Sequence, residues 1–196
     1  MDPKKYVAEF VGTFLLTLAV LTSLTFSLPL ATPIAAGLTL MLVVYTLGPI
    51  SGAHINPAVT LSLLSVKKVS PVDAVLYIVA QFVGAVAAMG VLSALGGSLP
   101  AVGGADSVAI FVAEALGAFV LLFGISAVVH GKVDDDISGI IIGGSLLLGI
   151  LLAARASNGV LNPAVAVGIG SISATYILAP IVGGLIAVWL YKYVAK

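Results

Sequence analysis

The sequence predicts an all-helical integral membrane protein with six membrane-crossing helices and two shorter helices. Three observations support this fold class: few charges, six long apolar runs, and one tripeptide that occurs twice. Of the 196 residues, 61% are hydrophobic and only 8% are charged, whereas a soluble domain has about 25% charged residues. So small a charged fraction cannot cover a water-exposed surface, and it is typical of a chain surrounded by lipid.

Six apolar runs approach the roughly 20 residues that a helix needs to cross the bilayer core. The first resembles a signal peptide because it follows Lys4 and Lys5. However, it contains Glu9 and is followed by further runs of similar length, so we interpret it as a retained span. Two other helical runs are too short to cross alone at about 1.5 Å per residue. The expected spans are 5–27, 32–48, 72–96, 106–130, 137–155 and 173–195, and the short helices are 56–66 and 162–170.

The distribution of basic residues predicts the orientation. Six crossings place both termini on one side of the membrane, together with the connections 66–71 and 131–136. The opposite side holds only Arg155, and cytoplasmic loops carry the excess of Lys and Arg. We therefore expect cytoplasmic termini in the cell membrane. The lysines on the terminal side are Lys4, Lys5, Lys67, Lys68, Lys132, Lys192 and Lys196.

The chain is expected to form a single membrane domain, 1–196, from two similar halves, approximately 1–98 and 99–196. Residues 7–14 (V-A-E-F-V-G-T-F) align with residues 112–119 (V-A-E-A-L-G-A-F), and each half has one Asn-Pro-Ala. Each half holds three spans, an odd number, so the second half enters the membrane from the opposite face. Inverted repeats with broken helices place their functional site at the midplane, between the halves.

The repeated tripeptide is an expected helix start. Its copies are Asn56-Pro57-Ala58 and Asn162-Pro163-Ala164. Asn is a good N-cap, and Pro is tolerated at the first helical position. Two half-helices entering from opposite faces would meet start to start, with their positive dipole ends converging. That arrangement disfavours cations, hydronium included, while the two amides still bind neutral polar molecules.

Several motifs resemble those of the aquaporin (major intrinsic protein) family. Residues 51–60 (S-G-A-H-I-N-P-A-V-T) resemble its first pore loop, and A-E-F-V-G-T-F and A-E-A-L-G-A-F resemble its first and fourth helices. A-Q-F-V-G-A and A-P-I-V-G-G resemble its third and sixth helices. The resemblance covers nearly the whole chain. It implies a right-handed bundle of six transmembrane helices plus two re-entrant half-helices, a pore in each protomer, and a homotetramer.

The same resemblance implies roles for individual residues. Asn56 and Asn162 would lie at the pore centre, and Glu9 and Glu114 would hold the pore-loop backbone. A carboxylate inside a span is costly and marks a function or an internal partner. The alternative is that these glutamates, Glu9 above all, face the headgroups. His54 matches a histidine on the cytoplasmic side of the pore loop; the alternative is a capped loop histidine without a transport role.

The outer constriction departs from the family pattern. Its four positions, counted from the two asparagines, fall on Ala36, Ile150, Gly159 and Val165. The family usually has an arginine where this chain has Val165, and commonly an aromatic residue where it has Ala36. Loss of both widens the mouth and removes a positive charge and a donor. The wider mouth would pass larger neutral solutes, or it would dewet and close. The short loops 97–105 and 155–161 weigh against a dedicated glycerol channel, whereas the open constriction favours one, so the two observations cancel.

Arg155 has two interpretations. In the first, its side chain curls into the mouth and replaces the missing charge. In the second, which we favour, it caps the fifth span and faces the headgroups.

The leading function is passive conduction of water and small uncharged solutes such as glycerol, urea or ammonia. The sequence has no cysteine, metal-ligand spacing, phosphate loop or nucleophile–base pair, so we expect no cofactor, metal or enzymatic activity. It has no basic block, so nucleic acid is not an expected partner, whereas membrane lipids are. The alternatives are an ion-coupled transporter, with Glu9 or Glu114 as its titratable group, and a non-conducting structural membrane protein.

Overall fold

The computed structural model describes residues 2–26 and 28–196, and these residues contain only helices and connections. Six helices are long and apolar enough to cross a membrane, with the 3-10 turn η1 (Asp135–Ile137) extending one of them. The fold class predicted from the sequence is therefore confirmed. The long helices are α1 (Pro3–Thr25), α2 (Thr32–Ser51), α4 (Pro71–Ala94), α5 (Val108–Val129), α6 (Ser138–Ala153) and α8 (Ala174–Val194); the short ones are α3 (Pro57–Ser65) and α7 (Pro163–Ile169).

The predicted helix ends differ from the observed ends by three residues or fewer. The largest difference is at α2, which continues past Pro49 to Ser51. A proline removes a single N–H from the helix ladder, and here the helix closes at Gly52, whose φ of 88° suits a left-handed cap. The Gly52 N–H donates to the Gly48 carbonyl at 2.8 Å. The predicted end of the first span, residue 27, lies outside the described residues.

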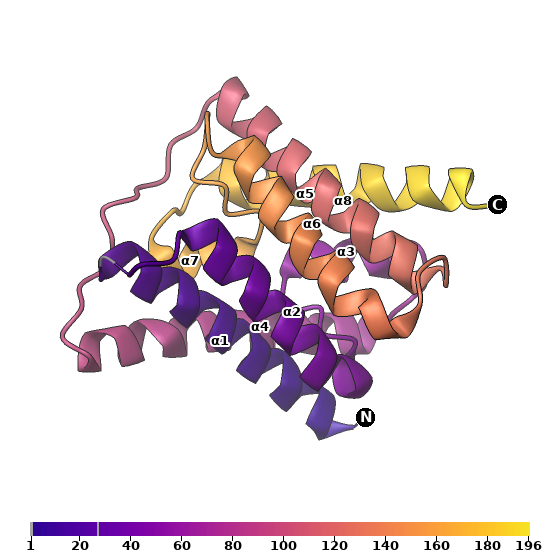
Figure 1. The fold of residues 1–196 in the computed structure, drawn as a ribbon, viewed down its shortest axis with the longest axis horizontal. Helices are drawn as coiled ribbons and strands as arrows, with labels where there is room; N and C mark the ends of the chain where they lie inside the picture. The colour runs from indigo at the N-terminus through magenta and orange to yellow at the C-terminus, as the bar shows by residue number, and fades with distance from the viewer. Residues whose placement is uncertain (1, 27) are drawn as a thin grey trace.

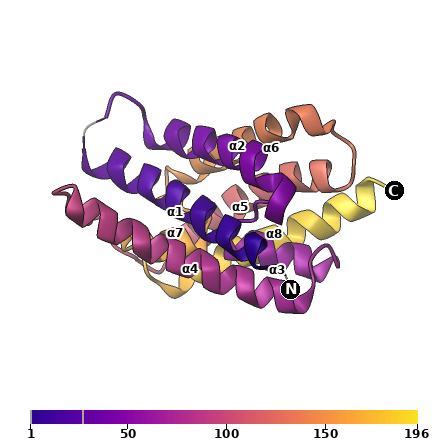
Figure 2. The same ribbon diagram turned by 90° about the horizontal axis from the view of Figure 1, so that it is seen from below.

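Both termini lie toward one end of the bundle, as does the connection 131–137 (Figures 1 and 2). The connection 96–107 lies at the opposite end (Figure 1). This arrangement is the one expected for an even number of crossings. The lysine count given above supports our proposal that the terminal end is cytoplasmic.

Four helix pairs make the most extensive contacts in the bundle: α5 with α8, α1 with α4, α5 with α6, and α2 with α6. Each short helix packs mainly on a long helix of the opposite half, α3 on α8 and α7 on α4. Such an exchange of short helices supports the proposed inverted repeats 1–98 and 99–196, because each half completes the wall of the other.

Close helix packing depends on two glycines at aligned positions of the two halves. A Cβ at Gly84 would lie 2.5 Å from the Phe10 carbonyl oxygen, where α4 crosses α1. A Cβ at Gly183 would overlap the Ala115 carbonyl oxygen, where α8 crosses α5. Small residues allow helix backbones to approach closely in lipid, where dispersion contacts replace the hydrophobic effect as the driving force.

Gly183→Ala is therefore expected to destabilise the protein by about 3 kcal/mol, the upper part of the usual range for overpacking, because the obstacle is backbone. Thermal unfolding in detergent would measure the loss. Gly144→Ala is the matched control, since no heavy atom lies within 4 Å of a Cβ at that exposed helical position. Equal melting temperatures for the two variants would contradict the close-approach argument.

Candidate pore and its supports

A cavity of about 910 Å³ lies between the two halves of the chain. The residues that line it come from both pore loops and from α1, α2, α3, α5, α6 and α7. Both asparagines of the repeated tripeptide line it, as do all four residues assigned to the outer constriction. His54 lines it as well, so the structure brings seven of the residues singled out in the sequence to the wall of one cavity.

The two half-helices begin at the asparagines. The Asn56 Oδ1 accepts the Ala58 N–H at 2.8 Å, and the Asn162 Oδ1 accepts the Ala164 N–H at 3.0 Å, so each side chain caps its own helix. Pro57 and Pro163 occupy the first helical positions, where no donor is missed. Ala58 and Ala164 are fully buried beside them.

Each asparagine also bonds to the opposite loop. The Asn56 Nδ2 donates to the Leu161 carbonyl at 2.9 Å, and the Asn162 Nδ2 donates to the Ile55 carbonyl at 3.0 Å. An amide nitrogen carries two hydrogens, so one hydrogen of each remains for a molecule in the cavity. The two half-helix starts are therefore fixed to each other as well as to the cavity wall.

The residue before each asparagine has strained backbone. Ile55 has a φ of 39° and Leu161 a φ of 55°. Residues with bulky side chains, such as Ile and Leu, rarely adopt the left-handed backbone region. Such backbone strain persists only where the surrounding contacts enforce it. The repeated strain turns the chain sharply just before each half-helix begins, which sets the position of the asparagine.

Glu9, on α1, enforces this conformation in the first half. Its Oε1 accepts the Ser51 hydroxyl at 2.7 Å and the His54 N–H at 2.9 Å. Its Oε2 accepts the Ile55 N–H at 2.6 Å and the Gln81 side-chain amide at 2.8 Å. The carboxylate is fully buried and every bond holds it to the loop or its neighbours, so it does not face the headgroups.

Glu114, on α5, has the corresponding place in the second half. Its two oxygens accept the Val160 N–H at 3.0 Å and the Leu161 N–H at 2.7 Å. The side chain is fully buried. Hydrogen bonds to a charged acceptor are among the stronger ones in proteins. No role for Gln81, which donates to Glu9, was predicted from the sequence; an amide side chain inside an apolar span was the available signal.

His54 lines the cavity and is also bonded within its loop. Only 7% of the residue is exposed, its Nδ1 lies 3.2 Å from the Thr60 hydroxyl oxygen, and its ring meets the Tyr77 ring edge-on with centroids 5.1 Å apart. The geometry therefore shows a histidine that is fixed within its loop and also lines the cavity, and a transport role for it stays a prediction.

The four residues assigned to the outer constriction give the cavity an apolar stretch of wall. Ala36, Ile150, Gly159 and Val165 all line the cavity, and the last is only 3% exposed. Gly159 has a φ of 61°, and a Cβ there would lie 3.1 Å from the Ile150 side chain. Glycine at this position thus allows both the positive φ and the close approach of the Ile150 side chain. None of the four side chains offers a hydrogen-bond donor to a passing molecule.

Arg155 does not line this cavity. It is exposed, two residues after the end of α6, and lines a pocket of about 240 Å³ that shares Val102, Ala154, Ser157 and Asn158 with the cavity. Its position agrees with the interpretation that places this side chain at the end of the fifth span.

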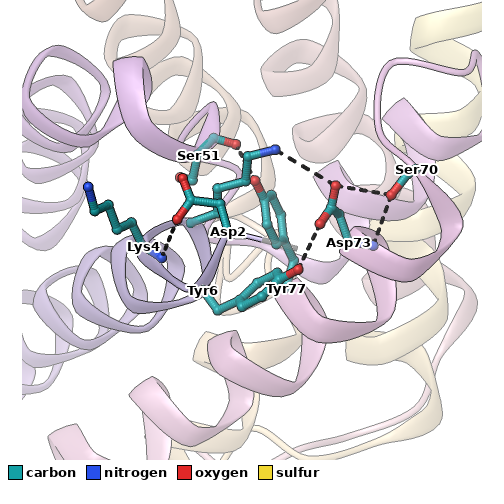
Figure 3. Close-up of polar contacts among 8 residues, drawn as sticks. Asp2, Lys4, Tyr6, Ser51, Ser70, Asp73 and Tyr77 are labelled. Atoms are coloured by element: carbon teal, nitrogen blue, oxygen red, sulfur yellow. Dashed lines mark hydrogen bonds and ion pairs between the residues drawn. The ribbon is translucent and has the colours of Figure 1, made fainter.

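Side-chain contacts fasten both ends of the bundle. At the terminal end, the Tyr6 hydroxyl donates to Asp73 at 2.9 Å and the Tyr77 hydroxyl donates to the Ser51 carbonyl at 2.7 Å, joining α1, α4 and the first pore loop (Figure 3). At the outer end, the Asn158 side-chain amide donates to the Val102 carbonyl at 2.8 Å. Hydrogen bonds from Thr175 and Ser173 hold the pKa of Asp106 below its usual value.

Comparisons with known proteins identify the family. The family model described as "Major intrinsic protein" matches residues 2–191. The chain is 36% identical to the glycerol uptake facilitator protein-like 6 of Lactiplantibacillus plantarum, with 94% of each covered. It is 32% identical to the probable aquaporin AqpM of Archaeoglobus fulgidus, over 98% of this chain and 97% of the relative.

A solved structure has the same fold. The aquaglyceroporin from Plasmodium falciparum superposes with a TM-score of 0.74 at 21% identity, covering 98% of this chain and 96% of that one. Members of the matched family are channels rather than enzymes. Six membrane-spanning helices, two half-helices meeting at a cavity and these relatives lead to one conclusion: the chain belongs to the major intrinsic protein family and is an integral membrane channel protein.

Proposed function

We propose that the protein conducts water and small uncharged solutes, such as glycerol, urea or ammonia, passively through a pore in each protomer. The observation that carries the proposal is the single cavity lined by both asparagines and by the four apolar constriction residues. Relatives named as a glycerol uptake facilitator, an aquaporin and an aquaglyceroporin support this class of solute. The family further supports a homotetramer in which lipid surrounds the apolar outer faces.

Selectivity in this pore would come mainly from its centre. Two helix N-termini, fixed by Asn56 and Asn162, face one another there, and their partial positive charges oppose the entry of cations. A neutral molecule replaces its lost water contacts with the free amide hydrogens. The outer constriction of Ala36, Ile150, Gly159 and Val165 would select by width alone, and we propose that it is wide.

An ion-coupled transporter would need a titratable group exposed to the transported molecule. Neither Glu9 nor Glu114 lines the cavity, and both carboxylates are occupied by loop N–H donors. These contacts favour a structural task for the two glutamates. A non-conducting protein differs from the proposal only in its flux.

The test is a stopped-flow measurement of vesicle volume with purified protein in liposomes, under water, glycerol and urea gradients. We expect all three to move faster than in empty liposomes, without dependence on a proton gradient. Water flux equal to that of empty liposomes would contradict the proposal. Solute uptake that requires a proton gradient would instead indicate a coupled transporter.

A further inference from the structure

The charges along the cavity are concentrated at one mouth. Among the described residues that line it, only Lys68 and Asp135 carry a formal charge at neutral pH. Lys68 follows α3 in the connection to α4, and Asp135 begins η1, so both lie at the end that also holds the termini. We call this end, defined by Lys68 and Asp135, the charged mouth. The outer constriction has no charge, and Arg155 lies outside the cavity.

Lys68 is held across the charged mouth. Its Nζ donates to the Val129 carbonyl at 3.0 Å, at the last residue of α5. The carboxyl end of a helix carries partial negative charge, so the contact suits an ammonium group. It links the first half of the chain to the second. The backbone N–H of Lys68 also donates to the Leu63 carbonyl at 2.9 Å, which closes the turn after α3.

The charge of Lys68 is not cancelled by a direct partner. Across residues 2–26 and 28–196, Lys5 with Asp73 is the one ion pair within 4.0 Å. Asp135 shares the cavity wall without forming such a pair with Lys68. Both Lys67 and Lys68 are exposed, but Lys67, which has a φ of 65°, does not line the cavity. The two adjacent lysines therefore differ in their access to the pore.

We propose that Lys68 is a specificity-determining residue whose ammonium group repels protons and metal cations at the charged mouth, and that Asp135 opposes it. The fixed positive side-chain charge of this pore thus lies at its inner end, while its outer constriction is apolar. The inference rests on the proposed function, because it needs a pore that conducts.

The test compares proton flux, followed with an entrapped pH-sensitive dye, and potassium flux in liposomes containing the wild type or one variant. Lys68→Gln should raise both fluxes about fivefold, the factor that one unit charge about 4 Å from an ion is worth in water. Lys68→Arg should behave as the wild type. Asp135→Asn should lower both fluxes, and Lys67→Gln, the matched control, should leave them unchanged.

Salt provides a second readout. The screening length falls from about 10 Å at 0.1 M to about 3 Å at 1 M, so the difference in flux between Lys68→Gln and the wild type should shrink at high salt.

Equal proton and potassium fluxes through Lys68→Gln and Lys67→Gln, or higher fluxes through Asp135→Asn than through the wild type, would overturn the inference. If water flux is normal in that case, the proposed function stands. Absence of water flux from every protein would reject the proposed function instead. Asp135→Asn and Lys68→Arg keep the test decisive if Lys68→Gln folds poorly.

Discussion

Glu114→Ala is expected to lower the melting temperature of the protein in detergent by about 10 °C. The yield of folded protein should fall as well. The change leaves the buried N–H groups of Val160 and Leu161 without an acceptor. An unsatisfied buried polar group costs about 1–3 kcal/mol, and in a chain of this length about 1 kcal/mol shifts the midpoint by roughly 2–4 °C. The positive φ of Leu161 loses its support at the same time.

Two further variants separate structure from charge. Glu114→Gln retains one acceptor oxygen, so it should lose about half as much stability and leave selectivity nearly intact. Asp134→Asn removes a carboxylate from an exposed turn and should change stability by no more than about 0.5 kcal/mol. A stable Glu114→Gln variant whose flux depends on a proton gradient would contradict the supporting role and favour a transporter.

Val165→Arg is expected to lower glycerol and proton flux about tenfold. The new side chain fills the apolar constriction and adds a positive charge beside the pore, where a unit charge about 4 Å away is worth between about 1 and 4 kcal/mol. Stopped-flow shrinkage with glycerol and dye-based proton uptake in liposomes would measure the two losses. Water, which is smaller, should lose less.

Val165→Met adds length without charge and is the matched control for size. It should reduce glycerol flux while leaving proton flux close to that of the wild type. Glycerol flux that is the same in Val165→Arg and the wild type would mean that Val165 does not line the constriction, and the assignment of Ala36, Ile150 and Gly159 by the same count would then be withdrawn.

Patterns local in the chain predicted most of the fold. Apolar runs defined the six spans, and the two Asn-Pro-Ala copies defined the half-helices, because capping and helix starts depend on adjacent residues. The path of a loop could not be predicted in this way. Glu9 bonds to residues 42 to 72 positions away, and such contacts depend on how the helices pack.

The same limit applies to the charged side chains. The lysine count treated Lys67 and Lys68 alike, yet the turn after α3 directs only the second to the cavity. Arg155 follows the end of α6 directly and is not among the residues that line the cavity, although the pocket that it lines adjoins the cavity at Ser157 and Asn158. Local turn geometry at one or two residues decides whether such a side chain lines the cavity, and this geometry cannot be predicted from composition.

The reciprocal bonds of Asn56 and Asn162 bear on the order of assembly. They join residues 105 and 107 positions apart, across two loops that we propose enter the membrane from opposite faces. Neither amide can find its carbonyl partner until the opposite loop has turned back into the bilayer. During synthesis we therefore expect the Asn56 Nδ2 to lack its Leu161 partner, while Oδ1 already caps α3, until the loop before α7 is in place.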